Sequence, residues 1–168
     1  MEEKMTRRTI FYVAAAYGTA AFTGAMLTIG LVLGAFWKSL PPVEFLDWFA
    51  ANSSLIGRVI PLFVIPAVVG LAGAAVCDRG SPQRPLWTAA LMCMAGILAI
   101  TFAFHLPMNN VFNAKAISPS GVGAMLDRWL WLHGLRIALG LAASVLSILA
   151  IHSGSARGKN AHEGMLTI

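Results

Sequence analysis

The amino-acid sequence predicts an all-α integral membrane protein, folded as an antiparallel four-helix bundle with an interfacial helix between the first and second spans. Composition is the first reason: 58% of the 168 residues are hydrophobic and 11% are charged, whereas about 25% of residues are charged in soluble domains. The second reason is that uncharged stretches long enough to cross a bilayer recur along the chain. The segments between these stretches are too short to form a separate domain of about 50 residues.

Four membrane spans are expected within one domain of residues 1–152. They are predicted at residues 9–34, 57–77, 86–106 and 129–151. Each apolar stretch reaches the roughly 30 Å of the hydrocarbon core at about 1.5 Å per residue. Pro61 and Pro66 are expected to bend the second span, and Pro107 is expected to end the third because it disfavours helical backbone at the preceding residue. Residues 153–168 then form a polar cytoplasmic tail.

The segment after the first span predicts the interfacial helix. It begins with Pro41 and Pro42. Trp48 and Phe49 come three and four residues after Phe45, which places the three rings on one face of a helix. Such a helix would lie at the membrane surface with its aromatic side chains toward the bilayer.

Basic residues near the spans predict the orientation of the chain. One side carries seven of them: Lys4, Arg7, Arg8, Arg79, Arg84, Arg157 and Lys159. The other side carries four: Lys38, Arg58, Lys115 and Arg128. Because cytoplasmic segments are richer in Lys and Arg, both termini are expected in the cytoplasm. The basic residues are scattered singly, which makes nucleic acid a poor candidate partner.

Polar residues gather where the third span ends. Thr101 and His105 are four residues apart and share a helix face, and the break at Pro107 is expected to return Asn109 and Asn110 to the same end. A single membrane histidine is usually a structural hydrogen-bonding residue. The proline and the two amides beside it leave a functional role equally open.

The fourth span carries a stripe of polar and small residues that must face protein. Its members are Trp129, His133, Arg136, Gly140, Ala143 and Ser147. A leucine stripe is expected to face lipid, and it comprises Leu132, Leu135, Leu139, Leu146 and Leu149. Arg136 lies about 10 Å below Trp129, where its charge must be paired or hydrated. An intramembrane arginine indicates a functional site, although Arg136 could instead extend past Trp131 to the surface.

The topology is expected to bring the two polar groups together. Because the third helix runs outward and the fourth returns, His105, Asn109, His133 and Arg136 fall at similar depth. The convergence of these four polar residues predicts a pocket inside the outer half of the bundle. Its occupant would be a hydrophobic small molecule.

A threonine before a proline-x-asparagine turn, followed by a tryptophan and an arginine in the next span, forms a recognisable set. These residues are Thr101, Pro107-Met108-Asn109, Trp131 and Arg136. The set resembles the anthrone oxygenase-like family of small four-helix membrane proteins, and the resemblance covers residues 11–151. Many members of that family are bacterial, so the resemblance implies an inner-membrane location.

The resemblance also implies a reaction, the oxidation of an anthrone-like polycyclic phenol to a quinone by O₂ without another cofactor. His105 or His133 would act as the base, Arg136 would stabilise the enolate, and Asn109 would donate a hydrogen bond to an oxygen. The substrate would be bound by Thr101, Phe104, Asn110, Trp129 and Trp131.

Two other classes of function are left open by the residues. His105 and His133 could ligate copper, iron or haem in a membrane redox protein, with Met108 or Glu44 nearby, although the sequence lacks a metal-binding spacing. The polar stripe would also suit a small transporter or a non-enzymatic membrane component. Whether the chain forms a homo-oligomer is left open as well.

Overall fold

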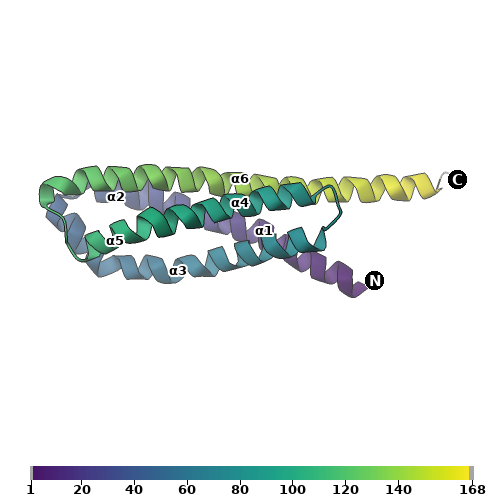
Figure 1. Cartoon of the computed structure of the whole chain (residues 1–168), viewed down its shortest axis with the longest axis horizontal. Helices are drawn as coiled ribbons and strands as arrows, with labels where there is room; N and C mark the ends of the chain where they lie inside the picture. Colours follow the sequence, from purple (N-terminus) through teal and green to yellow (C-terminus); the bar gives the residue numbers. More distant parts are fainter. Residues whose placement is uncertain (1, 167–168) are drawn as a thin grey trace.

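The computed structural model describes the backbone of residues 2–166 and the side chains of residues 6–154. All elements in this described part are helical, and they form four long segments that alternate in direction (Figure 1). The elements are α1 (Glu2–Thr28), η1 (Ile29–Leu33), α2 (Gly34–Ser39), α3 (Pro42–Cys77), α4 (Arg84–Ile100), η2 (Thr101–His105), α5 (Leu106–Asn113) and α6 (Pro119–Leu166). The predicted all-α fold is therefore confirmed.

Four segments are long and apolar enough to cross a membrane. They are Thr6–Ser39, Pro42–Cys77, Arg84–Asn113 and Pro119–Gly154. The helix α6 continues past the expected end of the fourth span to Leu166, so the tail predicted at residues 153–168 begins inside a helix. Residues 167–168, at the end of that tail, lie outside the described residues.

Each helix packs against two antiparallel neighbours. The segment α1 contacts α3 and α6, and α4 contacts the same two helices. Both chain ends and the turn between α3 and α4 lie at one end of the bundle, and the connections α2–α3 and α5–α6 lie at the other (Figure 1). We call these the terminal end and the loop end.

The third segment corrects one expectation, because the helix does not stop at Pro107. The element η2 is a π-helical turn, in which the Leu106 N–H donates to the Thr101 carbonyl five residues back. Pro107 then lies in the first turn of α5, where a backbone N–H is not required. The extra residue in the π-helical turn accommodates the ring and the missing N–H of Pro107, and the helix continues to Asn113.

The expected interfacial helix also differs in detail. Residues after Pro42 are helical, but they continue without a break into the second span as the single helix α3. Pro61 and Pro66 lie inside this helix. The polar stretch Asn52, Ser53 and Ser54 and the following Gly57 lie between Pro42 and Pro61, and they are helical as well.

Aromatic side chains close the loop end of the bundle. Buried rings of α2, α3, α5 and α6 pack together there; they are Trp37, Phe45, Phe49, Phe112 and Trp129, and we call them the aromatic cap. The Trp37 ring makes edge contacts with Phe49 at 5.6 Å and with Trp129 at 5.4 Å between ring centroids. Ion pairs outside the cap connect different segments, namely Lys38 with Asp127 and Lys115 with Asp47.

Small residues bring α1 and α3 into close contact in the half of the bundle nearer the terminal end. A methyl group added at Gly18 would overlap with the backbone of Ala67, and one added at Gly70 would overlap with the backbone of Ala15. Ala15 and Ala67 are fully buried. Helices in lipid gain contact area when small residues allow this approach.

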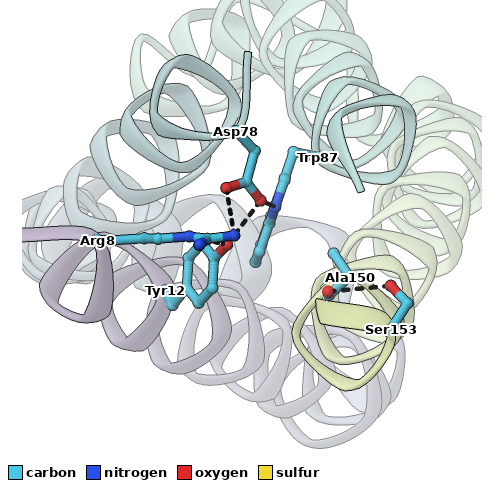
Figure 2. A network of polar contacts seen from close by, with 6 residues as sticks. All are labelled: Arg8, Tyr12, Asp78, Trp87, Ala150 and Ser153. Atoms are coloured by element: carbon cyan, nitrogen blue, oxygen red, sulfur yellow. Dashed lines mark hydrogen bonds and ion pairs between the residues drawn. The ribbon is translucent and has the colours of Figure 1, made fainter. Parts of the chain in front are cut away.

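A buried carboxylate holds the terminal end together, as Figure 2 shows. The Asp78 side chain is fully buried and pairs with the Arg8 guanidinium at 2.8 Å. Its Oδ2 accepts hydrogen bonds from the Tyr12 hydroxyl at 2.6 Å and from Trp87 Nε1 at 2.8 Å. Two hydrogen bonds and one ion pair hold the carboxylate, and they fasten α1 and α4 to the turn between α3 and α4.

The polar stripe of α6 faces protein as predicted, because all six of its members are buried. The leucine stripe faces lipid only in part: Leu135 and Leu149 are exposed, but Leu132 is buried. The exposed face is instead centred on Trp131, Val145 and Ile148. The helix contacts both α1 and α4, so its buried face is wider than one stripe of side chains.

The close approach of α1 and α3 makes a stability prediction. Gly18→Ala should destabilise the folded protein by about 1–3 kcal/mol, because its methyl group would push two backbones apart. Gly24→Ala on the same helix is the matched control, since nothing lies within 4 Å of the added methyl group. Thermal unfolding in mild detergent should show a lower Tm for Gly18→Ala and an unchanged or slightly higher Tm for Gly24→Ala. Equal Tm values would contradict the close packing.

Candidate functional site

A cavity of about 210 Å³ lies below the aromatic cap, between the four segments. Its walls are formed by Met26, Ile29, Trp37, Phe49, Ser53, Ile56, Gly57, Ile60, Pro61, Thr101, His105, Leu106, Asn109, Trp129, His133 and Arg136. All four segments contribute to this list. The cavity is therefore a product of the tertiary fold and of no single helix.

Six of the nine site residues proposed from the sequence line this cavity: Thr101, His105, Asn109, Trp129, His133 and Arg136. The other three lie outside it. Trp131 is 70% exposed, because two residues along a helix is more than half a turn from Trp129. Phe104 is exposed with the Arg128 guanidinium 5.8 Å from its ring centroid, and Asn110 is exposed on α5.

The hydrogen bond of His133 fixes its tautomer. Its Nε2 lies 2.8 Å from the Met26 carbonyl oxygen, and a carbonyl can only accept, so Nε2 carries the hydrogen. The other ring nitrogen, Nδ1, has a free lone pair and no partner among the described residues. The Trp129 ring stacks on the imidazole with 4.9 Å between centroids and 16° between planes. The arrangement leaves the Nδ1 lone pair unused among the described residues.

His105 lies across the cavity wall on η2 and is 1% exposed. Its ring is 4.7 Å from Trp129 and 6.0 Å from His133 between centroids. Neither ring nitrogen makes a hydrogen bond of normal geometry within the described chain. Both nitrogens are buried as well, so the hydrogen-bonding capacity of the imidazole is unused in this structure.

Within residues 6–154, Arg136 is a buried cation without a carboxylate partner. It is 6% exposed, and its Nη2 donates to the Met26 sulfur, a weak acceptor, at 3.1 Å. The ion pairs of the described residues join other side chains, and Arg136 Nε has no hydrogen-bond partner. A buried charge in this condition is costly until an anion or a strong acceptor binds to it.

Asn109 and Thr101 are held by local bonds. The Asn109 Oδ1 accepts from Trp129 Nε1 at 2.8 Å, so the NH₂ group of its amide is not used in that bond. The Thr101 hydroxyl donates to the Ile97 carbonyl at 2.7 Å. Asn109 can thus donate to a ligand oxygen, whereas Thr101 keeps only acceptor capacity.

Unpartnered polar atoms concentrate at this cavity. Within the part of the chain whose side chains are described, seven buried side-chain N or O atoms lack a hydrogen-bond partner, and five of them belong to residues of the cavity wall. These five atoms are Trp37 Nε1, His105 Nδ1, His105 Nε2, His133 Nδ1 and Arg136 Nε. Buried polar groups normally have partners. The concentration indicates a place for a polar or ionised ligand.

The ligand set for a metal is limited to two histidines. No group of three or more His, Cys, Asp or Glu side chains comes together in residues 6–154. Met108 lines a separate hollow with Phe104, and Glu44 is exposed on α3, so neither joins His105 and His133. The thiols of Cys77 and Cys93 are free.

Sequence reasoning missed ten of the sixteen wall residues, and Met26 and Trp37 are the two of them that bear on the polar groups of the site. Met26 contributes its backbone carbonyl and its sulfur, and an apolar side chain in an apolar stretch gives no signal for either role. Trp37 contributes an unpartnered Nε1. A tryptophan at the end of a span usually lies at the membrane surface, so only the tertiary contacts distinguish it from such a residue.

The comparisons with known proteins connect this region to one family. Residues 45–146 match the family model described as anthrone oxygenase, which is more than half of the chain. The match spans α3, α4, η2 and α5 and most of α6. The comparisons with curated proteins and with solved structures found no match.

The unpaired charge of Arg136 makes a prediction about stability. Arg136→Met should raise the stability of the ligand-free protein by about 1–4 kcal/mol, because it replaces a buried, uncompensated cation by an apolar chain of similar length. Arg8→Met is the contrasting control: it removes the cation that pairs with buried Asp78 and should lower Tm. Thermal unfolding in detergent measures both. A fall in Tm for Arg136→Met would show that Arg136 is a structural residue.

Proposed function

The chain belongs to the anthrone oxygenase family, and from this membership we propose that it oxidises an anthrone-like polycyclic phenol to a quinone with O₂ in the cavity described above. In this reaction the methylene carbon of the substrate loses two hydrogens and gains one oxygen atom. The second oxygen atom leaves as water, so that no further reductant or cofactor is required. The observation that carries the proposal is the buried, unpaired Arg136 beside a histidine with a free ring nitrogen.

The first step is removal of a proton from the methylene group. His133 is the proposed base, because the Met26 carbonyl holds its hydrogen on Nε2 and leaves the Nδ1 lone pair free. The electron pair of the broken C–H bond moves into the ring system and onto the carbonyl oxygen, which becomes an enolate oxygen. His105 is the second candidate for the same role.

Arg136 and Asn109 are proposed to stabilise the enolate oxygen. A fixed cation in a site shielded from water stabilises developing negative charge more strongly than the same cation in solution. The enolate would in turn supply the anion that Arg136 lacks in the ligand-free protein. The NH₂ group of Asn109 is placed to donate to a substrate oxygen, since only its Oδ1 bonds to Trp129.

The enolate then transfers electrons to O₂, and a carbon–oxygen bond forms at the former methylene carbon. The peroxide anion formed in this way takes the proton back from protonated His133 and becomes a hydroperoxide. The hydroperoxide then loses water: His133 removes the remaining C–H proton, the O–O bond breaks, and the carbon becomes a carbonyl. His105, neither of whose ring nitrogens makes a hydrogen bond within residues 6–154, is the residue we propose to return a proton to the departing hydroxide.

The wall of the cavity suits a flat ring system. Trp37, Phe49 and Trp129 are the aromatic side chains that line it, and they take the stacking role that the resemblance assigned in part to Phe104 and Trp131. The volume of about 210 Å³ lies below the roughly 300–1,000 Å³ of most ligand pockets. A compact substrate with few substituents fits this volume best.

An activity assay tests the proposal. Protein in lipid vesicles should convert anthrone to anthraquinone faster than protein-free vesicles, with matching O₂ uptake. His133→Ala should lower the rate by about 10²–10⁴-fold, and Arg136→Gln by about 10²–10³-fold. Gly24→Ala, which touches nothing within 4 Å, is the control and should retain the wild-type rate. Undiminished turnover after replacing both His105 and His133 by Ala would exclude a histidine base.

The same sample tests for haem, copper or iron. The proposal requires only O₂, so an optical spectrum and an elemental analysis of the active protein should show no stoichiometric metal. A Soret band, or about one metal per chain that is lost in His105→Ala, would favour the redox-protein alternative instead.

We also propose that both termini lie in the cytoplasm of a bacterial inner membrane. The terminal end of the bundle carries the larger number of Lys and Arg residues, and the cavity then lies in the outer half. A fluorescent protein fused to the C-terminus should fluoresce in cells, and a phosphatase that requires the periplasm should be inactive in the same position. The reverse pattern would place the cavity near the cytoplasm.

A further inference from the structure

The cavity is closed toward the loop end of the bundle. The five rings of the aromatic cap are each at most 5% exposed, and the residues of the ion pairs Lys38–Asp127 and Lys115–Asp47 each lie within three residues of a cap residue in the sequence. A ligand arriving from the aqueous side would have to separate this cluster. The cap is therefore a barrier to water and a poor entrance for a substrate.

The side wall between α3 and the η2–α5 region is different. Gly57 and Pro61 of α3 and Leu106 of α5 line the cavity and are also exposed on the molecular surface. Leu106 is 41% exposed, and no atom lies within 4 Å of the position that a Gly57 side chain would occupy. Residues that are both cavity wall and surface mark an opening, which we call the side opening.

We expect the side opening to lie at the edge of the hydrocarbon layer. It is next to Arg58, an exposed cation on α3, and the uncharged stretch of α3 begins at the following residue and ends at Cys77. At about 1.5 Å per residue this stretch spans roughly 28 Å, close to the thickness of the hydrocarbon core. Gly57 is therefore at the level where the acyl chains meet the headgroups.

We propose that the substrate of the proposed reaction, a planar aromatic phenol, enters the cavity sideways from the membrane, across Gly57. The rings of such a molecule lie among the acyl chains while its oxygen atoms stay at the headgroup level, next to Arg58. Inside, the oxygen meets Arg136 and the rings meet Trp37 and Trp129. The class of ligand rests on the proposed function, whereas the route rests on the shape of the cavity.

Reversible closure of the side opening tests the route. Cys77 and Cys93 are first replaced by Ala, and Gly57→Cys is then introduced and labelled in lipid vesicles with benzyl methanethiosulfonate. Anthraquinone serves as the probe, and its binding is followed by quenching of tryptophan fluorescence, because Trp37 and Trp129 line the cavity. Gly24→Cys with the same label is the control, since Gly24 is exposed on α1 and outside the cavity wall.

The expected result is a fall of at least tenfold in the association rate of anthraquinone with labelled Gly57→Cys, reversed when dithiothreitol removes the benzyl group. Labelled Gly24→Cys should bind at the unlabelled rate. Unchanged binding to labelled Gly57→Cys would overturn the route and leave the proposed function intact. Failure of anthraquinone to bind to the unlabelled protein would overturn the ligand class and with it the proposed function.

Discussion

The site depends on the buried charge of Arg136, for which the described part of the folded chain provides no anionic partner. Arg136 is buried at the middle of the bundle, and the described residues offer its guanidinium only the sulfur of Met26. The carbonyl of the same methionine holds the His133 hydrogen, so one residue of α1 positions both groups. A buried arginine that served stability alone would have a carboxylate partner. Leaving it unpaired costs stability in the ligand-free protein, and we propose that an anionic ligand offsets this cost when it binds.

The two halves of the bundle serve different purposes. In the half near the terminal end, Gly18 and Gly70 bring α1 and α3 into backbone contact, and buried Asp78 fastens the turn between α3 and α4 to α1. In the other half the helices enclose a cavity beneath the aromatic cap. The π-helical turns η1 and η2 both contribute wall residues there, Ile29 and His105 among them. Rigid packing at one end thus supports a hollow at the other.

The sequence was sufficient for the elements that depend on periodicity. Apolar length predicted four membrane helices, and three- and four-residue spacing placed the stripe from Trp129 to Ser147 on the buried face of α6. The sequence analysis assigned both Trp129 and Trp131 to the site, but residues two apart lie on opposite faces of a helix. Helical spacing alone therefore argues against Trp131. The π turn before Pro107 and the role of Met26 could not be predicted, because both depend on backbone groups that no side-chain pattern reveals.

The central claim is that Arg136 binds the ionised oxygen of a planar aromatic ligand, and an optical titration tests it most directly. A hydroxyanthraquinone changes colour when its phenol loses a proton, so its absorption reports the ionised form within the protein. At a pH where the free compound is neutral, binding to the wild-type protein in vesicles should produce the spectrum of the anion, and binding to Arg136→Met should not. The spectrum of the neutral form in both proteins would contradict the account.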